Sequence, residues 1–487
     1  MKKNNTKQNL IYNMIYQILI MILPFITAPY LSRIIGKTGI GIYTYTYSIA
    51  HYFVLFSLMG LANYGNRKIA QNKDDVKKLN ETFSEIYLMQ IGFTVISLIS
   101  YLSMVFLLNF ENKNILIIQI MFVISAGIDI SWFFYGMEKF KLMVVRNTII
   151  KVITTICIFV FVKKASDLWK YAFIMAFSMF VSQLSLWVVL NKLVKFEKPS
   201  WEKVKKHIKP NLILFIPVIA VSLYRVMDKI MLGAISTMEQ TGIYENADKL
   251  VTLPLTITSS VGTVMMPKMA NIFAKGDNNK GKEYFRDSMQ LIVGISIAMS
   301  FGMAVVANDF APLYYGIEFS ECGKIMIVLS PILLIGSISN VVRTQYLIPK
   351  EKDKIYILSV VIGAVVNMII NLILINKFGA MGAAIGTIFA ELSVMLIQCI
   401  LSRNELEFKK YIKDSICFVF SGIVMYVVLR KIKTLLNVSF ISIIIEILIG
   451  IIIYGIVTIF TMFLLQRERL EHLIKLAKKN KVNNRII

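Results

Sequence analysis

Long, nearly uninterrupted runs of apolar residues are the feature that most constrains how this chain can fold. About fourteen such runs are separated by short polar stretches, most of them rich in lysine. A helix needs roughly 20 apolar residues to cross a bilayer, and these runs are of that length and too long for barrel strands. Because lipid offers no partners to backbone N–H and C=O groups, the runs predict an all-α integral membrane protein.

The basic residues between the runs predict the orientation of the helices. With the N-terminus placed inside, the inside segments hold about 35 lysines and arginines and the outside segments about 9, so both termini are expected in the cytoplasm. The first run lacks a cleavage site and is too long for a signal peptide, so it is expected to stay as a span. The expected spans are 9–32, 39–63, 82–109, 114–135, 142–162, 168–191, 211–233, 242–272, 287–308, 323–348, 355–376, 380–402, 412–429 and 439–466.

Charge and cysteine usage exclude several other classes. The net charge of +24 is explained by basic loops that face anionic membrane lipid, so no nucleic-acid partner is expected. Four scattered cysteines form no CxxC pair, and three histidines form no HExxH motif. The sequence therefore predicts no disulfide framework, no metal site and no cofactor.

A weak internal repeat divides the chain into two halves. Thr38–Tyr43 and Thr241–Tyr244 each follow a proline-containing span and a short outside loop, a pattern typical of transporters built from repeats. The prolines are Pro24, Pro29 and Pro217. The expected domains are a six-helix bundle at 1–191, a cytoplasmic linker at 192–210, a second six-helix bundle at 211–402, two additional helices at 403–466 and a basic cytoplasmic tail at 467–487.

Two amphipathic segments are expected at the membrane surface, one inside the linker 192–210 and one in the tail from Arg467 to Lys481. Ser200 is a candidate helix cap, and Trp201, Val204 and Ile208 then share one helical face while the lysines between them reach water. Within the twelfth span, Gly382 and Gly386 form a GxxxG pair that predicts close helix packing.

Charges inside the spans are candidates for function, because each costs at least ~2.5–3.5 kcal/mol at the bilayer centre. Arg225, Asp228 and Lys229 share one face of the seventh span, and Arg146 and Arg343 lie deep in their runs. A cationic cavity suits an anionic substrate, and carboxylates suit exchange against protons or Na⁺. Mutual pairing that merely holds the bundle together is the alternative, and the sequence leaves it open.

Four stretches carry a resemblance to a known family. They are Arg33–Gly36 leading into Gly39–Tyr43, Asp129–Phe140, Leu223–Gly233 followed by Thr241–Ala247, and Asn367–Thr387 followed by Glu391. In this order and spacing they resemble the polysaccharide transporters of the MOP superfamily, and the Wzx-type repeat-unit flippases best. The stretches reach from the first expected span to the twelfth, so the resemblance covers most of the chain.

The resemblance implies two pseudo-symmetric six-helix bundles around a central cavity, plus two C-terminal helices. It implies a flippase and not an enzyme, which moves undecaprenyl-pyrophosphate-linked oligosaccharide from the inner to the outer leaflet of the bacterial cell membrane for capsule, O-antigen or related polysaccharide. Alternating access, coupling to H⁺ or Na⁺ and a polysaccharide polymerase as partner are further implications. The candidate pyrophosphate-binding residues are Arg33, Arg146, Arg225, Lys229 and Arg343, and the candidate coupling carboxylates are Asp129, Asp228 and Glu391.

Three rival functions remain. A lipid II flippase of the same superfamily would use the same chemistry on a different sugar. A MATE-type drug/cation antiporter would need a more acidic cavity than these bases predict. A membrane enzyme of the same sugars would carry a large external loop, whereas the longest outside connection expected here, Asp309 to Cys322, has no basic residue. The carried sugar, the coupling ion and the oligomeric state stay open.

Overall fold

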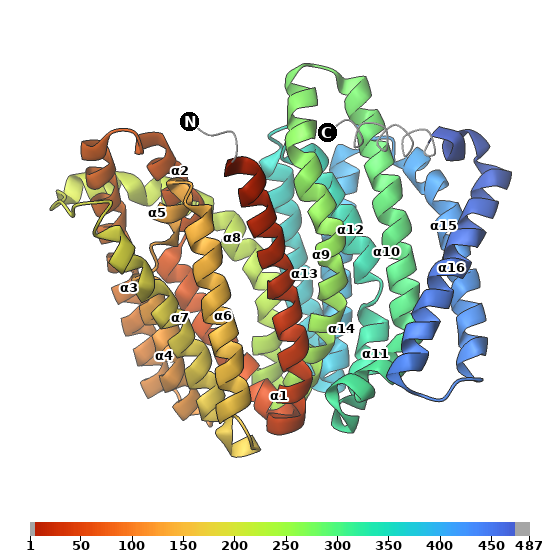
Figure 1. The fold of residues 1–487 in the computed structure, drawn as a ribbon, viewed down its shortest axis with the longest axis horizontal. Helices are drawn as coiled ribbons and strands as arrows, with labels where there is room; N and C mark the ends of the chain where they lie inside the picture. Colours follow the sequence, from red (N-terminus) through yellow and green to blue (C-terminus); the bar gives the residue numbers. More distant parts are fainter. Residues whose placement is uncertain (1–4, 473–487) are drawn as a thin grey trace. The chain divides into compact units, whose positions relative to one another are not determined.

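Helices account for the regular structure of the protein. The computed structural model describes residues 5–472, and every regular element in that range is a helix (Figure 1). Eleven of these described helices are long and apolar enough to cross a membrane, and a bent pair, Ile317–Leu329 with Ile332–Leu347, adds a twelfth if it forms one span. The predicted all-helical membrane fold is thereby confirmed, while the figure of about fourteen spans stays a prediction.

The chain divides by packing into two units, Met1–Gly242 and Ile243–Ile487. The first contains α1 (Asn5–Leu58), α2 (Leu61–Asn72), α3 (Val76–Leu107), α4 (Lys113–Gly127), α5 (Ser131–Gly136), α6 (Phe140–Phe161), the turn η1 (Ala165–Asp167), α7 (Leu168–Leu190), α8 (Trp201–Ile235) and the start of α9 (Met238–Ala274). The domain limits expected from the sequence stay predictions.

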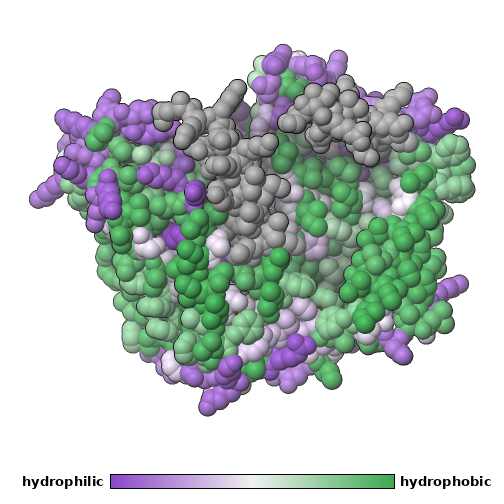
Figure 2. Space-filling view, viewed as in Figure 1, coloured by the Kyte–Doolittle hydropathy of each residue, from purple (hydrophilic) through white to green (hydrophobic). Residues whose placement is uncertain are grey.

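The second unit begins within α9. It contains α10 (Asn278–Tyr315), the turn η2 (Ile317–Phe319), α11 (Ser320–Leu329), α12 (Ile332–Val342), the π-helical segment η3 (Arg343–Leu347), α13 (Asp353–Phe378), α14 (Ala380–Ser402), α15 (Phe408–Lys433) and α16 (Phe440–Leu465). Figure 2 shows hydrophobic residues over the middles of helices such as α16 and hydrophilic residues gathered at helix ends, the distribution expected where lipid covers the helix middles.

The first two expected spans form one long helix with a kink. α1 runs through the expected loop at 33–38, and its non-helical residue is Gly36, with φ 67° and ψ 177°. A positive φ is open to glycine without a steric penalty, so the chain bends there and the helix resumes. The sequence located the break between the spans correctly but predicted a loop where the structure has a kink.

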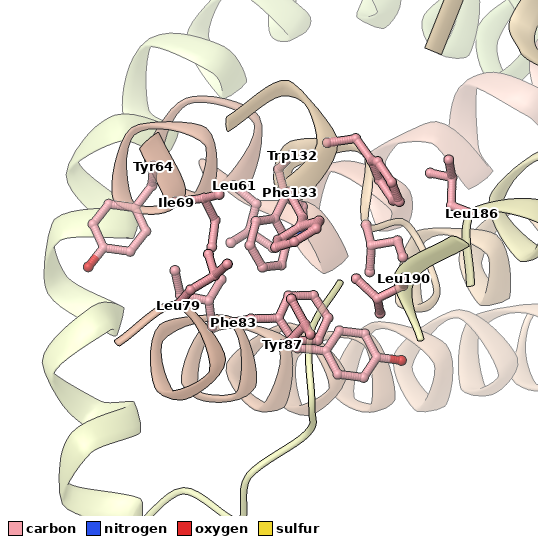
Figure 3. Close-up of a cluster of buried hydrophobic side chains, with 14 of the residues drawn as sticks. Leu61, Tyr64, Ile69, Leu79, Phe83, Tyr87, Trp132, Phe133, Leu186 and Leu190 are labelled. Carbon is pink, nitrogen blue, oxygen red and sulfur yellow. The ribbon is translucent and has the colours of Figure 1, made fainter. Parts of the chain in front are cut away.

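An aromatic core holds the first unit together at the end where α3 begins. Phe83, Trp132 and Phe133 are almost fully buried, and the Trp132 ring stacks on Phe83 with 5.6 Å between ring centres (Figure 3). A Cβ at Gly65 would lie 2.7 Å from the Trp132 ring, so α2 approaches α5 closely only because this residue has no side chain. The cluster therefore joins α2, α3 and α5 and draws in α7 through Leu186 and Leu190.

Close backbone packing shapes the second unit. A Cβ at Gly382 would lie 2.6 Å from the backbone of Leu374, which confirms that this glycine lets α14 pack tightly on α13. The larger of two hydrophobic clusters in the described part of the second unit includes Met289, Phe285 and Tyr346. α12 passes directly into the π-helical segment η3 at Arg343, and such segments are frequent at functional sites.

Candidate functional site

A buried polar network lies in the first unit where α4 breaks and α5 begins. The Gln90 side-chain nitrogen donates to the backbone carbonyls of Ala126 (2.7 Å) and Asp129 (2.8 Å), and its oxygen accepts from the Trp132 indole (2.9 Å). The Asp129 carboxylate accepts from the backbone N–H of Ser131 at 2.8 Å. These bonds satisfy the backbone groups freed by the break, as buried polar groups require.

Arg146 lies beside this network on α6. Its guanidinium donates to the Ser182 carbonyl at 3.3 Å and to Asn147 Oδ1 at 2.6 Å, and it interacts electrostatically with Asp129. The structure thus brings together one predicted pyrophosphate-binding base and one predicted coupling carboxylate. Both side chains are partly buried.

The predicted cluster on α8 faces α1. Asp228 is 1% exposed, and Lys229 lies close enough to His51 of α1 to interact with it electrostatically. The Tyr52 hydroxyl donates to the Ser222 carbonyl at 3.2 Å, and Tyr52 also interacts electrostatically with Asp228. A carboxylate this deep in a membrane helix is costly unless it is compensated, and its burial shows that Asp228 faces the protein interior and not the lipid.

Arg225 and Arg33 are the exposed members of the predicted set. Arg225 lies one helical turn before Lys229 on α8, and Arg33 lies on α1 just before the kink at Gly36. Beyond the kink, Lys37 forms an ion pair of 2.9 Å with Glu239. All the predicted bases except Arg343 belong to the first unit.

Close backbone contact follows the kink. A Cβ at Gly41 would lie 1.6 Å from the Met238 carbonyl oxygen, and one at Gly242 would lie 2.0 Å from that of Lys37. These two glycines come from the two repeated stretches noted in the sequence. The repeat therefore marks a place where α1 and the start of α9 can touch only because side chains are absent.

The remaining predicted residues, Arg343 and Glu391, lie in the second unit, on η3 and α14. Arg343 opens the π-helical segment, with Nη1 3.4 Å from the Tyr356 hydroxyl and the guanidinium 5.6 Å from the Tyr356 ring centre. Its Nε is buried without a hydrogen-bond partner in the described part of the chain. Glu391 is half-buried on α14, one turn after Thr387, whose hydroxyl lies 2.8 Å from that of Tyr244.

Two clusters of polar side chains were not predicted from the sequence. Tyr64, His207 and Glu85 form a hydrogen-bonded chain between α2, α8 and α3. Glu283, Asp287 and His472 are the one described group with metal-ligand spacing, and Asp287 there also pairs with Arg469 at 2.6 Å. The sequence offers no signal for either group, because their partners are far apart along the chain.

Comparison with known proteins decides the family. Residues 6–273 match the model of the family described as "Polysaccharide biosynthesis protein", which is more than half of the chain. The chain belongs to this family. The resemblance to polysaccharide transporters predicted from the sequence is thereby confirmed.

Individual proteins are similar to this chain along most of its length. It is 23% identical over 407 residues to the "Putative O-antigen transporter" of Escherichia coli (strain K12), which covers 83% of this chain and 98% of that protein. Its fold is similar to that of "Lipid II flippase MurJ, inward closed conformation", with a TM-score of 0.76, 16% identity, and coverage of 94% of this chain and 99% of that one.

A third similarity places the fold in a wider group. An inward-facing multidrug resistance MATE transporter of the MOP superfamily aligns with a TM-score of 0.56 at 12% identity, over 81% of this chain and 99% of that chain. Flippases and antiporters thus share this fold, so the fold alone does not separate the functions. The family match to a polysaccharide biosynthesis protein and the similarity to O-antigen transporters are the comparisons that bear on function.

Proposed function

We propose that this protein translocates undecaprenyl-pyrophosphate-linked oligosaccharide repeat units from the inner to the outer leaflet of the bacterial cytoplasmic membrane, for capsule, O-antigen or a related polysaccharide. The similarity to an O-antigen transporter over 98% of that transporter's length is the observation that carries the proposal. A polymerase of the same polysaccharide would then act on the translocated lipid. Both chain ends face the cytoplasm in this account.

The predicted bases suit the pyrophosphate. Arg225 is exposed on α8 with Lys229 one turn further on, and charge-assisted hydrogen bonds from such groups to phosphate oxygens are stronger than neutral ones. Arg33, Arg146 and Arg343 are proposed as further contacts along the path. The sugars would be accommodated by a hydrated polar lining, while the lipid tail stays in the bilayer.

The predicted carboxylates suit coupling to a cation. Asp228 is buried beside Tyr52, and Asp129 lies near Arg146. Binding H⁺ or Na⁺ changes the charge of such a site, and a buried charge is costly enough for that change to favour one conformation over another. Glu391 is proposed as the coupling carboxylate of the second unit. Bends at Pro24, Pro29 and Pro217 would let the helices move during alternating access.

A gene deletion tests this function. Lipid-linked sugars are extracted from cells without the gene and assigned to leaflets by their access to an impermeant enzyme. We expect a complete undecaprenyl-pyrophosphate repeat unit to accumulate on the cytoplasmic side. Accumulation of lipid II would instead indicate the peptidoglycan-precursor flippase, and unchanged lipids with sensitivity to cationic drugs would indicate a MATE-type antiporter.

The same strain tests the site. It is complemented with the wild-type gene, with Arg225→Ala or with Lys205→Ala, at matched protein levels. Loss of one charge-assisted contact is expected to reduce polymer export about tenfold with Arg225→Ala. Lys205→Ala is the matched control, because Lys205 lies on the same helix over the Trp201 ring. Normal export by the Arg225 variant would remove Arg225 from the site.

A further inference from the structure

A second group of charged residues lies away from the predicted substrate path, in the first unit at the end where α3 begins. Arg67 and Lys68 of α2 and Lys203 and Lys206 of α8 line a hollow of about 500 Å³. This volume is in the range of small-molecule binding sites. The proposed function does not use this hollow.

The charges of the hollow do not balance. Lys203 lies 3.4 Å from Glu81 and 3.8 Å from Glu85, the two carboxylates of the lining. Arg67, Lys68 and Lys206, in contrast, make no ion pair with any of residues 5–472. Four bases face two carboxylates in this lining, and a concave surface with such an excess of positive charge concentrates anions from solution.

A histidine joins the hollow to the core beneath it. Nε2 of His207 is 2.8 Å from Glu85 Oε2, and Nδ1 is 2.7 Å from the Tyr64 hydroxyl. Figure 3 shows the Tyr64 hydroxyl pointing away from the other labelled side chains of the aromatic cluster. Burial raises the pKa of Tyr64, so its hydroxyl keeps its proton at neutral pH.

The direction of these hydrogen bonds depends on the charge of the imidazole. Glu85 is an acceptor, so Nε2 of His207 carries a hydrogen, and in the neutral ring Nδ1 accepts from Tyr64. A protonated ring has a hydrogen on Nδ1 as well and donates it to the Tyr64 oxygen. The Tyr64 hydroxyl hydrogen is then released and can bond to an acceptor in the hollow.

We propose that this hollow is a phosphate-binding site, in which Arg67, Lys68 and Lys206 contact the phosphate oxygens and protonation of His207 strengthens binding. Phosphate offers several acceptor oxygens that match the planar fork of arginine and the point charges of lysine. The phosphate belongs either to the headgroup of an anionic lipid or to a soluble phosphate compound.

Protonation has a defined sign in this site. The charged and titratable groups that line the hollow with His207 are Tyr64, Arg67, Lys68, Glu81, Glu85, Lys203 and Lys206. Protonation of His207 adds one positive charge and one free donor to the hollow, so binding of an anion is expected to be tighter at lower pH.

Two binding measurements on the full-length chain test the proposal. Inorganic pyrophosphate is titrated calorimetrically onto protein in a neutral detergent, and phosphatidic acid retention is measured by native mass spectrometry. We expect at least one probe to bind, and the double variant Arg67→Gln/Lys206→Gln to weaken it about a hundredfold, from about tenfold for each lost contact. Pyrophosphate binding that the double variant weakens identifies a soluble source, and phosphatidic acid binding alone that the double variant weakens identifies a headgroup.

Matched variants make the result decisive. Lys205→Gln removes a lysine of the same helix outside the hollow and is expected to leave binding unchanged. His207→Gln is expected to abolish the tighter binding at pH 6, and Tyr64→Phe to reduce it while leaving binding at pH 8 intact. The proposal is overturned if neither probe binds, if Lys205→Gln weakens binding as much as the double variant, or if the pH effect survives without His207.

Discussion

The helices α3 and α10 begin alike in the two units but are held in place by different chemistry. α3 follows the capping residue Asp75, and α10 follows the capping residue Asp277, whose carboxylates accept hydrogen bonds from the first-turn backbone. Eight residues after the cap, each helix buries a phenylalanine almost completely, Phe83 in α3 and Phe285 in α10. The first turns of α3 and α10 therefore share a capping aspartate and a buried phenylalanine at the same spacing.

The partners of the next carboxylate differ. Ten residues after the cap, Glu85 of α3 is hydrogen-bonded to His207 at 2.8 Å. At the same position of α10, Asp287 pairs with Arg469 at 2.6 Å. A guanidinium is charged at every physiological pH, whereas an imidazole is not. The nearer partner is thus an imidazole at Glu85 and a guanidinium at Asp287, although Glu85 also lies 3.8 Å from Lys203 and Asp287 lies 3.4 Å from His472.

The loops that pack against these helices show the same contrast. In the first unit the side-chain oxygen of Asn80 accepts from the backbone N–H of Lys195 at 3.1 Å, a neutral bond. In the second unit Glu405, in the loop after α14, pairs with Lys350 at 2.7 Å and also with Lys352. Similar helices in the two units can therefore be stabilised by a neutral hydrogen bond in the first unit and by ion pairs in the second.

The largest effect is expected from breaking the second unit's buried pair. Arg286 donates two hydrogen bonds, of 2.6 Å and 2.9 Å, to Asp414, which is 5% exposed. Arg286→Ala leaves this carboxylate buried without its partner and should destabilise the protein by about 3 kcal/mol. Thermal unfolding in detergent measures it, with the exposed Lys280→Ala as control. A loss no larger than the control's would show that the pair does not hold α15 to α10.

A smaller effect is expected in the first unit. His207→Leu removes the partner of both Tyr64 and Glu85 and should cost about 2 kcal/mol locally. Glu85 keeps Lys203 at 3.8 Å, so the loss is less than for Arg286. Hydrogen exchange should become faster in the first turns of α8 and stay unchanged at the start of α10. Equal change at both places would contradict the separation of the two kinds of contact.

The smallest effect is expected at Glu405. Lys350 and Lys352 lower the pKa of Glu405 from 4.5 to about 2, so this contact stabilises the protein fully above pH 4.5 and is lost as the pH falls towards 2. The side chain is 41% exposed, and solvent screening limits the effect to less than about 1 kcal/mol. Glu405→Gln should lower the unfolding temperature slightly at pH 7. It should also reduce the loss between pH 4.5 and pH 3, and an unchanged acid profile would argue against the pair.

The sequence predicts the fold because helices that cross a membrane require long apolar runs, and such runs can be recognised directly. Gly36 also marks the position of the break in α1. Polar partners are harder to predict, since they come from distant positions: His207 meets Tyr64 and Glu85 across 143 and 122 residues of chain. Helical periodicity correctly placed Val204 on a buried face of α8, with 0% exposure. Trp201, predicted on the same face, is 59% exposed because it is the first residue of α8.

Reconstitution tests the central claim most directly. The purified full-length chain is inserted into vesicles that contain a fluorescent undecaprenyl-pyrophosphate-linked oligosaccharide, and an impermeant glycosidase reports which leaflet holds the sugar. We predict that the labelled lipid changes leaflets only in vesicles with the protein, and more slowly with Arg225→Ala. Equal translocation in empty vesicles and in vesicles with the protein, under an imposed H⁺ or Na⁺ gradient of either sign, would contradict the assignment as a flippase.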